Sequence, residues 1–290
     1  MSTIARTTDA HGIHTRGRRA GRGIIGAGLW RTRFELLQYF RSLDTLVFTF
    51  LFPIVMLGLF SVAFGGEGDM QPAPGLPAVP VGQMYLPGMI AAGLLLSGFQ
   101  NLAIDIAIER SEGVLKRLGS TPLSPVSYFF GKIGQVAATG VLQAVLILAF
   151  AGLVLRVPLP TEPEKWLVFA GVFLLGITGS SLLGVAISAV PRTARSATAV
   201  VIPIVLVVQF LSGVYLFFYM LPGWLQTAAG LLPVKWMAQG MRYVFLPDSY
   251  AALEQGGEWN LAGVAIALTV WLVIGLVLAR VTFRWIRRDA

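Results

Sequence analysis

Long apolar runs alternate with short polar segments along almost the whole chain. The run at residues 46–64 contains no charged residue, and at about 1.5 Å per helical residue it reaches most of the way across a hydrocarbon core of about 30 Å. The runs do not alternate apolar with polar residues as a membrane barrel strand does. The pattern predicts an all-α membrane protein with six transmembrane helices, at about residues 46–64, 85–108, 127–155, 166–190, 196–218 and 260–279.

Three segments outside these runs have patterns of their own. Residues 24–44 mix large apolar with charged side chains, which suits a helix lying in the membrane interface. Residues 219–258 are apolar but interrupted by Pro222 and Pro233, so each piece is too short to span. They predict either a pair of external re-entrant helices or an amphipathic external segment packed on the bundle. Residues 1–23 are polar and rich in Gly and Arg, which predicts a disordered cytoplasmic tail that touches anionic lipid.

Composition favours a membrane location. Hydrophobic residues make up 56% of the 290 residues and charged residues 12%, well away from the averages of soluble domains. No cysteine is present, which excludes disulfides and thiolate metal sites. The net charge of +8 does not indicate nucleic-acid binding, because the basic residues gather at the ends of the apolar runs. We expect residues 24–290 to form one transmembrane domain.

The distribution of Lys and Arg predicts the orientation in the membrane. With six spans, 18 of the 22 basic residues fall on one side, including those at both ends of the chain and those within residues 109–132. The other side receives Arg156, Lys165, Lys235 and Arg242. Cytoplasmic segments carry the excess of Lys and Arg. We therefore expect a multi-pass protein of the cell membrane with both termini, and the segment between the second and third spans, in the cytoplasm.

Side chains suited to catalysis or ion coupling are scarce. No Gly-x-x-x-x-Gly-Lys-Ser/Thr phosphate loop occurs, so the chain is not expected to hydrolyse ATP itself. Asp105 is the one acidic residue within the runs, and its position about one turn from the cytoplasmic end of its helix predicts an ion pair with Arg110 or Lys116 rather than a proton relay. His11 and His14 do not indicate a metal site. We expect no catalytic residue, metal or cofactor in this chain.

A few side chains in the spans are candidates for a substrate path. Polar residues in lipid also hydrogen-bond between helices, and this is their more common role. A ring of aromatic side chains along the path would favour a glycan as substrate. The candidates are Phe99, Gln100, Asn101, Gln209, Phe210 and Ser212.

A charged segment, residues 109–122, separates the second and third runs. On a helix it would place its acidic residues and Lys116 close to one face, and Val114, Leu115 and Leu118 would form an apolar stripe. Pro122 would end the helix. Such a helix on the cytoplasmic side suits docking into a groove of a soluble partner. A solvated loop with cytoplasmic positive charges is the alternative.

This segment resembles a motif of ABC-2 type transporter permeases, Glu-Arg-Glu-x-Gly-Thr-Leu-x-Arg-Leu-x-x-Thr-Pro. Ser111 stands where an acid is common, and Val114 replaces the usual Thr. A later stretch, from Pro203 to Arg242, is similar to the second half of the daunorubicin-resistance type of drug-exporter permeases. The motif is matched at Glu109, Arg110, Glu112, Gly113, Leu115, Arg117, Leu118, Thr121 and Pro122.

The resemblance implies the membrane subunit of an ATP-driven exporter. In that family a six-span permease pairs with a second permease, identical or paralogous, and two copies of a separate ABC ATPase bind ATP and Mg. Those ATPases dock on the cytoplasmic coupling helix, so the matched residues of 109–122 would be coupling residues, and re-entrant helices would follow the fifth span. Nearly charge-free spans favour a small amphipathic, drug-like or lipid-like substrate. A glycan or glycolipid exporter, an ATP-independent channel or carrier, and a membrane enzyme are the alternatives.

Overall fold

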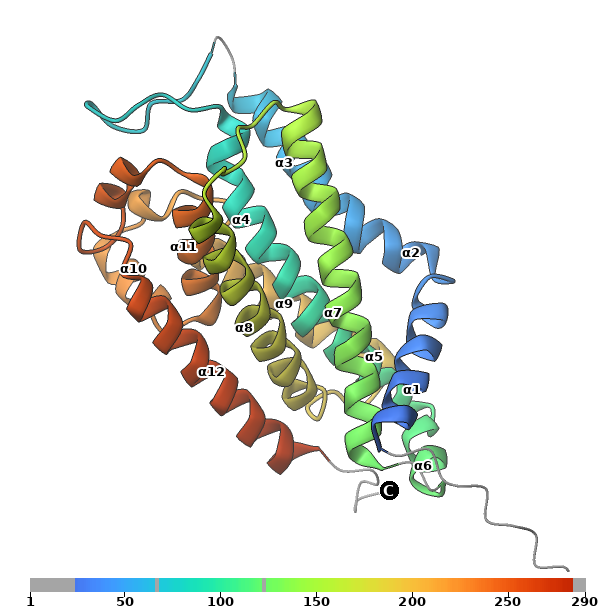
Figure 1. Cartoon of the computed structure of the whole chain (residues 1–290). Helices are drawn as coiled ribbons and strands as arrows, with labels where there is room; N and C mark the ends of the chain where they lie inside the picture. Colours follow the sequence, from blue (N-terminus) through green and yellow to red (C-terminus); the bar gives the residue numbers. More distant parts are fainter. Residues whose placement is uncertain (1–23, 66–67, 122–123, 284–290) are drawn as a thin grey trace, which may run out of the picture.

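Six helices long and apolar enough to cross a membrane run through the computed structural model, which describes residues 24–65, 68–121 and 124–283 (Figure 1). This confirms the predicted all-α membrane fold. The expected tail at residues 1–23 lies outside the described residues. The six candidate spans are Val47–Phe64, Val81–Ser111, Pro125–Val154, Pro163–Ile187, Ala194–Leu211 and Leu261–Thr282.

Several spans are composite helices. The first joins a π-helical turn, η1, to α3; the second joins α4, a π-helical turn η2, and α5; the third joins α7 to a π-helical turn η3. The fourth, fifth and sixth spans are α8, α9 and α12. Their bounds are η1 Val47–Leu51, α3 Phe52–Phe64, α4 Val81–Leu95, η2 Leu96–Asn101, α5 Leu102–Ser111, α7 Pro125–Ala149, η3 Phe150–Val154, α8 Pro163–Ile187, α9 Ala194–Leu211 and α12 Leu261–Thr282.

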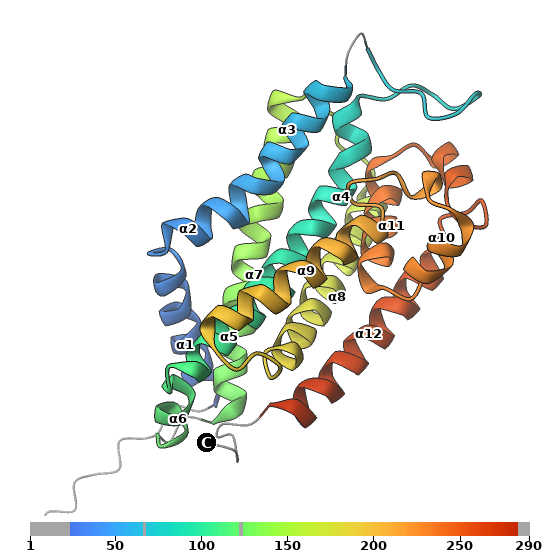
Figure 2. The same ribbon diagram turned by 180° about the vertical axis from the view of Figure 1, so that it is seen from behind.

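Shorter helices occupy the segments between and before the spans. Helices α1 (Ile24–Tyr39) and α2 (Leu43–Leu46) precede the first span, and α6 (Val114–Gly119) lies between the second and third. Helices α10 (Gly223–Ala229) and α11 (Pro233–Phe245) lie between the fifth and sixth. The start of α1, the end of α12 and α6 share one end of the bundle, here named the α6 end, while α10 and α11 lie toward the other (Figures 1 and 2).

Helix α4 forms the centre of the bundle. All of its residues, from Val81 to Leu95, are buried, and it packs against α3, α7, α8 and α11 (Figure 1). Glycine permits one of these contacts, because a Cβ added at Gly88 would lie 2.8 Å from the carbonyl oxygen of Val214. Such close backbone approach is a common use of small residues in membrane helices.

Helix α1 packs along the end of α7. A Cβ at Gly131 would lie 2.3 Å from Cγ of Arg31, and one at Gly134 would lie 2.6 Å from Oγ1 of Thr32. Their spacing of three places both glycines on one face of α7. The helix is shorter than the expected interfacial segment 24–44, and its position relative to a membrane interface stays a prediction.

The fifth span ends at Leu211, seven residues before the expected end at 218. Gly213 adopts a left-handed conformation with φ of 75°, and the amide of Val214 donates to the carbonyl oxygen of Gln209 over 3.2 Å. This is the Schellman arrangement, in which a left-handed glycine closes a helix. The apolar run continues past Gly213, and therefore the hydrophobic pattern alone did not reveal the end.

The region 219–258 contains two α-helices, α10 and α11, both too short to span, followed by a 3-10 helix, η5 (Asp248–Leu253). Pro233 occupies the first turn of α11, where its missing N–H leaves no intrahelical bond unmade. Helix α11 is buried against α4, α8 and α12. Gln83 on α4 donates through Nε2 to the carbonyl oxygen of Phe245 over 2.7 Å. The breaks at Pro222 and Pro233 agree with the sequence, and re-entry into the membrane stays a prediction.

Candidate functional site

The charged segment is not one helix, as the sequence had suggested. Helix α5 ends at Ser111 and α6 begins at Val114. Between them Gly113 has φ of 73°, a left-handed conformation that glycine adopts without the steric cost other residues incur. Its amide donates to the carbonyl oxygen of Arg110 over 3.2 Å. The glycine of the motif therefore produces a bend that turns α6 away from the axis of the second span.

Helix α6 is attached to the bundle by its apolar residues and exposes its basic ones. Leu115 is only 1% exposed and belongs to the main core, against which Leu118 is partly buried. Lys116 and Arg117 are exposed. Two of the three residues of the expected apolar stripe, Leu115 and Leu118, thus pack within the chain, because the bend directs these leucines inward. The surface left to a partner on α6 is basic.

The end of α6 is closed by hydroxyl groups. Oγ1 of Thr121 donates to the carbonyl oxygen of Leu118 over 2.6 Å, and Oγ of Ser120 donates to that of Arg117 over 2.7 Å. The same two carbonyls also accept the backbone amides of Ser120 and Thr121, so the hydroxyls reinforce the turn that ends the helix. Thr121 of the motif therefore has a local structural role, and Pro122 lies outside the described residues.

Arg110 connects the charged segment to another span. Its Nη1 donates to the carbonyl oxygen of Ser188, the residue that follows the last turn of α8. A cation at a helix C-terminus interacts favourably with the unpaired carbonyls and the helix dipole. Glu112, by contrast, is exposed at the end of α5.

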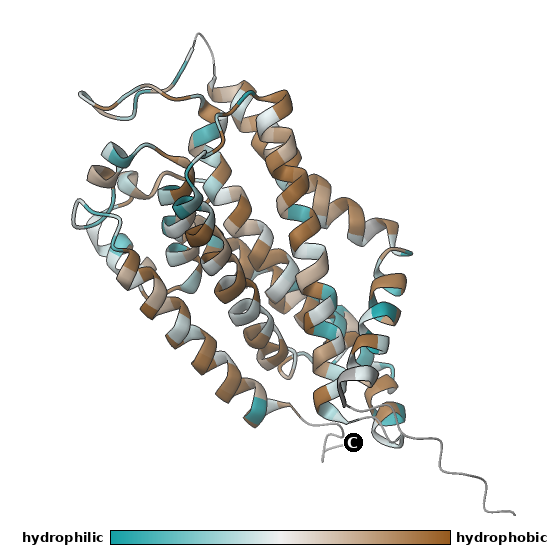
Figure 3. Cartoon of the chain, viewed as in Figure 1, coloured by the Kyte–Doolittle hydropathy of each residue, from teal (hydrophilic) through white to brown (hydrophobic). Residues whose placement is uncertain are grey.

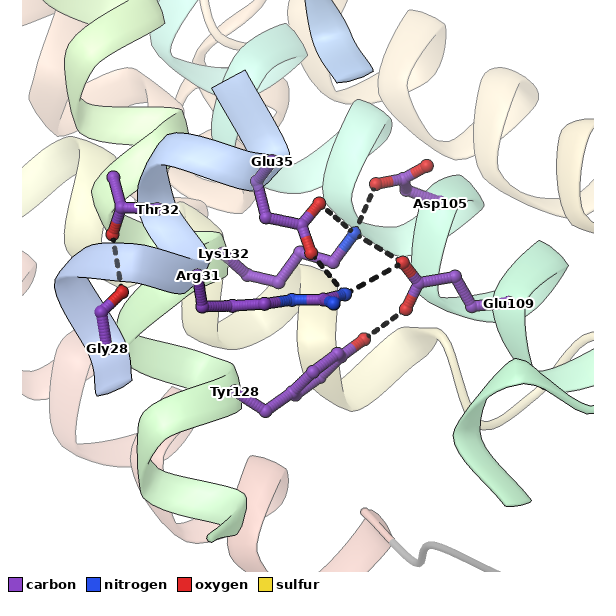
Figure 4. Close-up of polar contacts among 8 residues, drawn as sticks. All are labelled: Gly28, Arg31, Thr32, Glu35, Asp105, Glu109, Tyr128 and Lys132. Carbon is purple, nitrogen blue, oxygen red and sulfur yellow. Dashed lines mark hydrogen bonds and ion pairs between the residues drawn. The ribbon is translucent and has the colours of Figure 1, made fainter. Parts of the chain in front are cut away.

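A buried ionic network joins α1, α5 and α7 beside the charged segment (Figure 4). The ammonium of Lys132 on α7 lies 2.9 Å from Oε2 of Glu35 on α1. It also lies 2.7 Å from Oδ2 of Asp105 and 2.8 Å from Oε1 of Glu109, both on α5. Asp105 therefore pairs with Lys132, and the prediction of Arg110 or Lys116 was wrong. Residues on separate helices, 27 positions apart, form this pair.

Two further side chains complete the network. The hydroxyl of Tyr128 donates to Oε2 of Glu109 over 2.6 Å. Nη2 of Arg31 lies 2.5 Å from Oε1 of Glu35 and 3.7 Å from Oε1 of Glu109. Three carboxylates and two cations thus lie together. Burial raises the pKa of the Glu35 carboxyl above its usual value, an effect larger than the opposing one of Lys132.

The same three carboxylates could in principle ligate a metal ion. Glu35, Asp105 and Glu109 each offer an oxygen within 4.8 Å of the others. The ammonium of Lys132 lies among them, within hydrogen-bonding distance of one oxygen from each. As arranged, the three acids hold an ammonium group.

A second polar cluster lies deeper, where the π-helical turns of two spans face α7. Nε2 of Gln143 donates to the carbonyl oxygen of Thr49 over 2.9 Å, and Oγ of Ser97 donates to Oε1 of Gln143 over 2.9 Å. Nδ2 of Asn101 donates to Oγ1 of Thr49 over 2.8 Å. Thr49 lies in η1, and Ser97 and Asn101 in η2. Asn101 therefore takes part in helix packing, the commoner role of polar residues in lipid.

Residues 29–246 match the family model described as ABC-2 type transporter. The chain belongs to the ABC-2 type transporter family. This confirms the resemblance drawn from residues 109–122. The family comprises transport permeases, and membership implies an ABC ATPase as partner.

The relatives of this ABC-2 permease are distant ones. It is 26% identical over 210 residues to the putative transport permease ycf38 of Porphyra purpurea, with 72% of this chain and 70% of the relative covered. It is 25% identical over 263 residues to the probable doxorubicin resistance ABC transporter permease protein DrrC of Mycobacterium tuberculosis, covering 88% and 90%. The inner membrane transport permease YadH of Escherichia coli is 22% identical over 199 residues, covering 67% and 74%.

A polar cavity of about 570 Å³ opens in this permease between α1, α2, α5 and α9. Two of the candidate path residues, Gln100 and Asn101, line it, together with Glu35 and Asp105 of the ionic network. Phe99 is not among its lining residues. Figure 3 shows hydrophilic residues gathered at this end of α1, α5 and α7, within otherwise hydrophobic spans.

An apolar cavity of about 670 Å³ lies between α3, α4, α9 and the segment that follows α9. Of the candidate path residues, Phe210 lines it. Gln209 is buried elsewhere and accepts a hydrogen bond through Oε1 from the hydroxyl of Tyr215 over 2.6 Å, and Ser212 is also buried. Aromatic residues and methionines form most of the wall, namely Phe52, Phe60, Phe64, Tyr85, Phe210, Tyr215, Phe217, Met56, Met70 and Met220.

Proposed function

We propose that this chain is the membrane subunit of an ATP-driven ABC exporter that moves a small amphipathic molecule out of the cytoplasm. The observation that carries this proposal is the construction of α6. A short helix with a basic outer face follows the glycine bend of the family motif and is fixed to the bundle through Leu115. A soluble partner that binds such a helix could displace it, and the displacement would be transmitted to the spans.

The contacts of the charged segment connect α6 to several spans, so they could transmit this displacement. Arg110 reaches the end of α8, and Glu109 joins α5 to Lys132 on α7 and Arg31 on α1. A displacement of α6 would therefore act on four helices, α1, α5, α7 and α8, through buried or partly buried polar contacts. Coupling of this kind travels through packed elements that move as rigid bodies.

The partner in this proposal is a separate ABC ATPase that binds ATP and Mg. Two copies of this ATPase would bind a pair of permeases. The side of the bundle with most Lys and Arg would face the cytoplasm, and α6 lies on that side. Lys116 and Arg117 would contact acidic residues in the ATPase groove, since complementary charges align partners and raise association rates. The second permease is either an identical or a paralogous chain.

The two cavities support an amphipathic cargo. The polar cavity touches charged groups at the α6 end, and the apolar cavity lies farther along the bundle between α3 and α9. The name of the relative DrrC refers to doxorubicin resistance, which suits a drug-like substrate.

A glycan or glycolipid is the second candidate, and the aromatic wall of the apolar cavity favours it. Sugars stack on aromatic rings but also need several hydrogen-bonding groups. Tyr85 and Tyr215 are the lining residues with a polar side chain. We therefore place the amphipathic molecule first.

A charge-reversal experiment tests the docking role of α6. The wild-type chain is co-expressed with its candidate ATPase and purified through a tag on the permease. We expect the ATPase to co-purify with wild type and to be lost with the double variant K116E/R117E. The matched control is R192E/R195E, which reverses two exposed arginines, one just before α9 and one in its first turn, and should retain the ATPase. If both variants retained the ATPase equally, or both lost it equally, the docking role of α6 would be contradicted.

A further inference from the structure

The ionic network leaves one carboxylate oxygen without a partner among the described residues, and it belongs to Asp105, a residue that lines the polar cavity. Lys132 takes Oδ2 of Asp105, whereas Oδ1 has no hydrogen bond or ion pair to any described residue. The Asp105 side chain is 50% exposed, while those of Glu35 and Glu109 are 3% and 10% exposed and are contacted at both oxygens. Because three carboxylates face two cations, the uncompensated negative charge is most accessible at Asp105.

The cavity lined by Asp105 has lining residues of two kinds. Gln38, Gln100, Asn101 and Gln135 contribute amide groups. Phe48, Ile104, Ile108 and Ile202 contribute apolar surface. A volume of about 570 Å³ falls within the range of about 300–1,000 Å³ found for sites of drug-sized ligands.

We propose that this cavity binds amphipathic amines, with the ligand ammonium on Oδ1 of Asp105 and its apolar body against Phe48 and Ile202. The inference rests on the proposed export function and names the substrate class. Binding of one ammonium compensates the excess negative charge of the network. The carboxylate of Asp105 already accepts the ammonium of Lys132 at 2.7 Å, so the chemistry of the contact is present in the structure.

The charges around the cavity disfavour other ligand classes. An anion would meet the uncompensated charge of the network, and Arg31 and Lys132 are buried and already paired. A neutral amphipath would leave that charge unpaired. The amine itself has two sources, a soluble amphipathic amine or the ammonium headgroup of a lipid such as phosphatidylethanolamine.

A binding assay on the full chain alone tests the site. The protein is placed in nanodiscs, and energy transfer from its tryptophans to dansylcadaverine, a primary amine with an aromatic body, is measured against empty nanodiscs. Its N-acetylated derivative is the neutral counterpart. We expect Asp105→Asn to weaken binding of the amine about tenfold or more, as for a lost charge pair, and to leave binding of the N-acetylated compound unchanged.

Folding of the variant is addressed by its charge balance. Without the Asp105 charge, Lys132 and Arg31 still face Glu35 and Glu109, so the remaining network is neutral, and the thermal unfolding midpoint should stay close to wild type. The control is Glu164→Gln, which removes an exposed carboxylate in the first turn of α8 that does not line the cavity, and it should bind the amine as wild type does.

Each outcome decides a different point. Equal affinity for the amine and its N-acetylated form, or unchanged amine binding in Asp105→Asn, would overturn the site. Weaker amine binding in phosphatidylethanolamine nanodiscs than in phosphatidylcholine nanodiscs would assign the site to the lipid headgroup, and equal binding would assign it to the soluble amine. The assay contains no ATPase, so failure here with intact ATPase docking on α6 would remove the site and leave the exporter assignment standing.

Discussion

Lys132 is a buried lysine whose ammonium contacts three carboxylates. Replacing it with methionine would keep the length of the side chain and leave the three acids with Arg31 as their one cation. Breaking a buried ion pair on one side costs about 3–5 kcal/mol, and we expect Lys132→Met to lower the free energy of unfolding by about that amount. Thermal or denaturant unfolding in detergent measures it.

A double variant separates this charge effect from lost packing. Adding Glu109→Gln to Lys132→Met restores the net charge of the network, so the two changes should cost less together than the sum of their separate effects. Strictly additive costs would mean that the ion pairs do not stabilise the fold.

Lys235 gives a pH dependence of known sign. Burial lowers the pKa of its ammonium to about 8, from an ordinary value of 10.5. Between these values the unfolded chain binds more protons than the folded one, so the free energy of unfolding should rise as pH increases through this window. Lys235→Met should remove that rise. An equally steep rise in the variant would show that another group causes it.

The residue-level predictions from sequence succeeded where they concerned the position of a residue within one helix. They failed where they concerned a contact between two helices. The position of Asp105 near the end of its span was readable from the apolar run. Its partner was not, because Lys132 lies on another span and was interpreted as one of many cytoplasmic positive charges. The signal that could have indicated this pair is the presence of an acid, Asp105, and a base, Lys132, at similar depth in consecutive spans.

At the scale of elements, the apolar runs located all six spans, because the length needed to cross a bilayer is fixed. The breaks were harder to predict. Gly113 and Gly213 adopt positive φ, and whether a glycine does so depends on contacts that the pattern of apolar residues does not contain. The π-helical turns of the first two spans were also missed, and they carry the hydrogen bonds among Thr49, Ser97, Asn101 and Gln143.

The bend at Gly113 gives an element-level prediction. Proline fixes φ near −65° and lacks the N–H that bonds to Arg110, so Gly113→Pro should reorient α6 without disturbing the spans. We expect the bundle to fold and the ATPase to lose stimulation by the permease, measured as phosphate release in the reconstituted complex.

A matched control for this variant is a Gly→Pro substitution far from α6. Gly75→Pro places the same residue at another glycine with positive φ and open surroundings, in the loop after the first span. It should leave stimulation intact. Full stimulation in Gly113→Pro, or its loss in both variants, would contradict the coupling role of the bend.

At the scale of the whole molecule, hydrophilic residues gather toward the two ends of a bundle of mostly hydrophobic spans (Figure 3). The α6 end combines the basic helix, the ionic network and the polar cavity, while α10 and α11 lie toward the other end (Figure 1). The two ends are linked by α4, α7 and α8, with the Thr49–Gln143 cluster between them. This arrangement suits a subunit that receives force at one end and changes shape along its length.

Transport by purified components tests the central claim most directly. The permease is reconstituted in liposomes with and without its ABC ATPase, and movement of dansylcadaverine across the bilayer is followed with ATP, without ATP, and with a non-hydrolysable ATP analogue. The account predicts directional movement only with the ATPase and hydrolysable ATP. Movement by the permease alone, without ATP or a second protein, would contradict it and identify the chain as a channel or carrier.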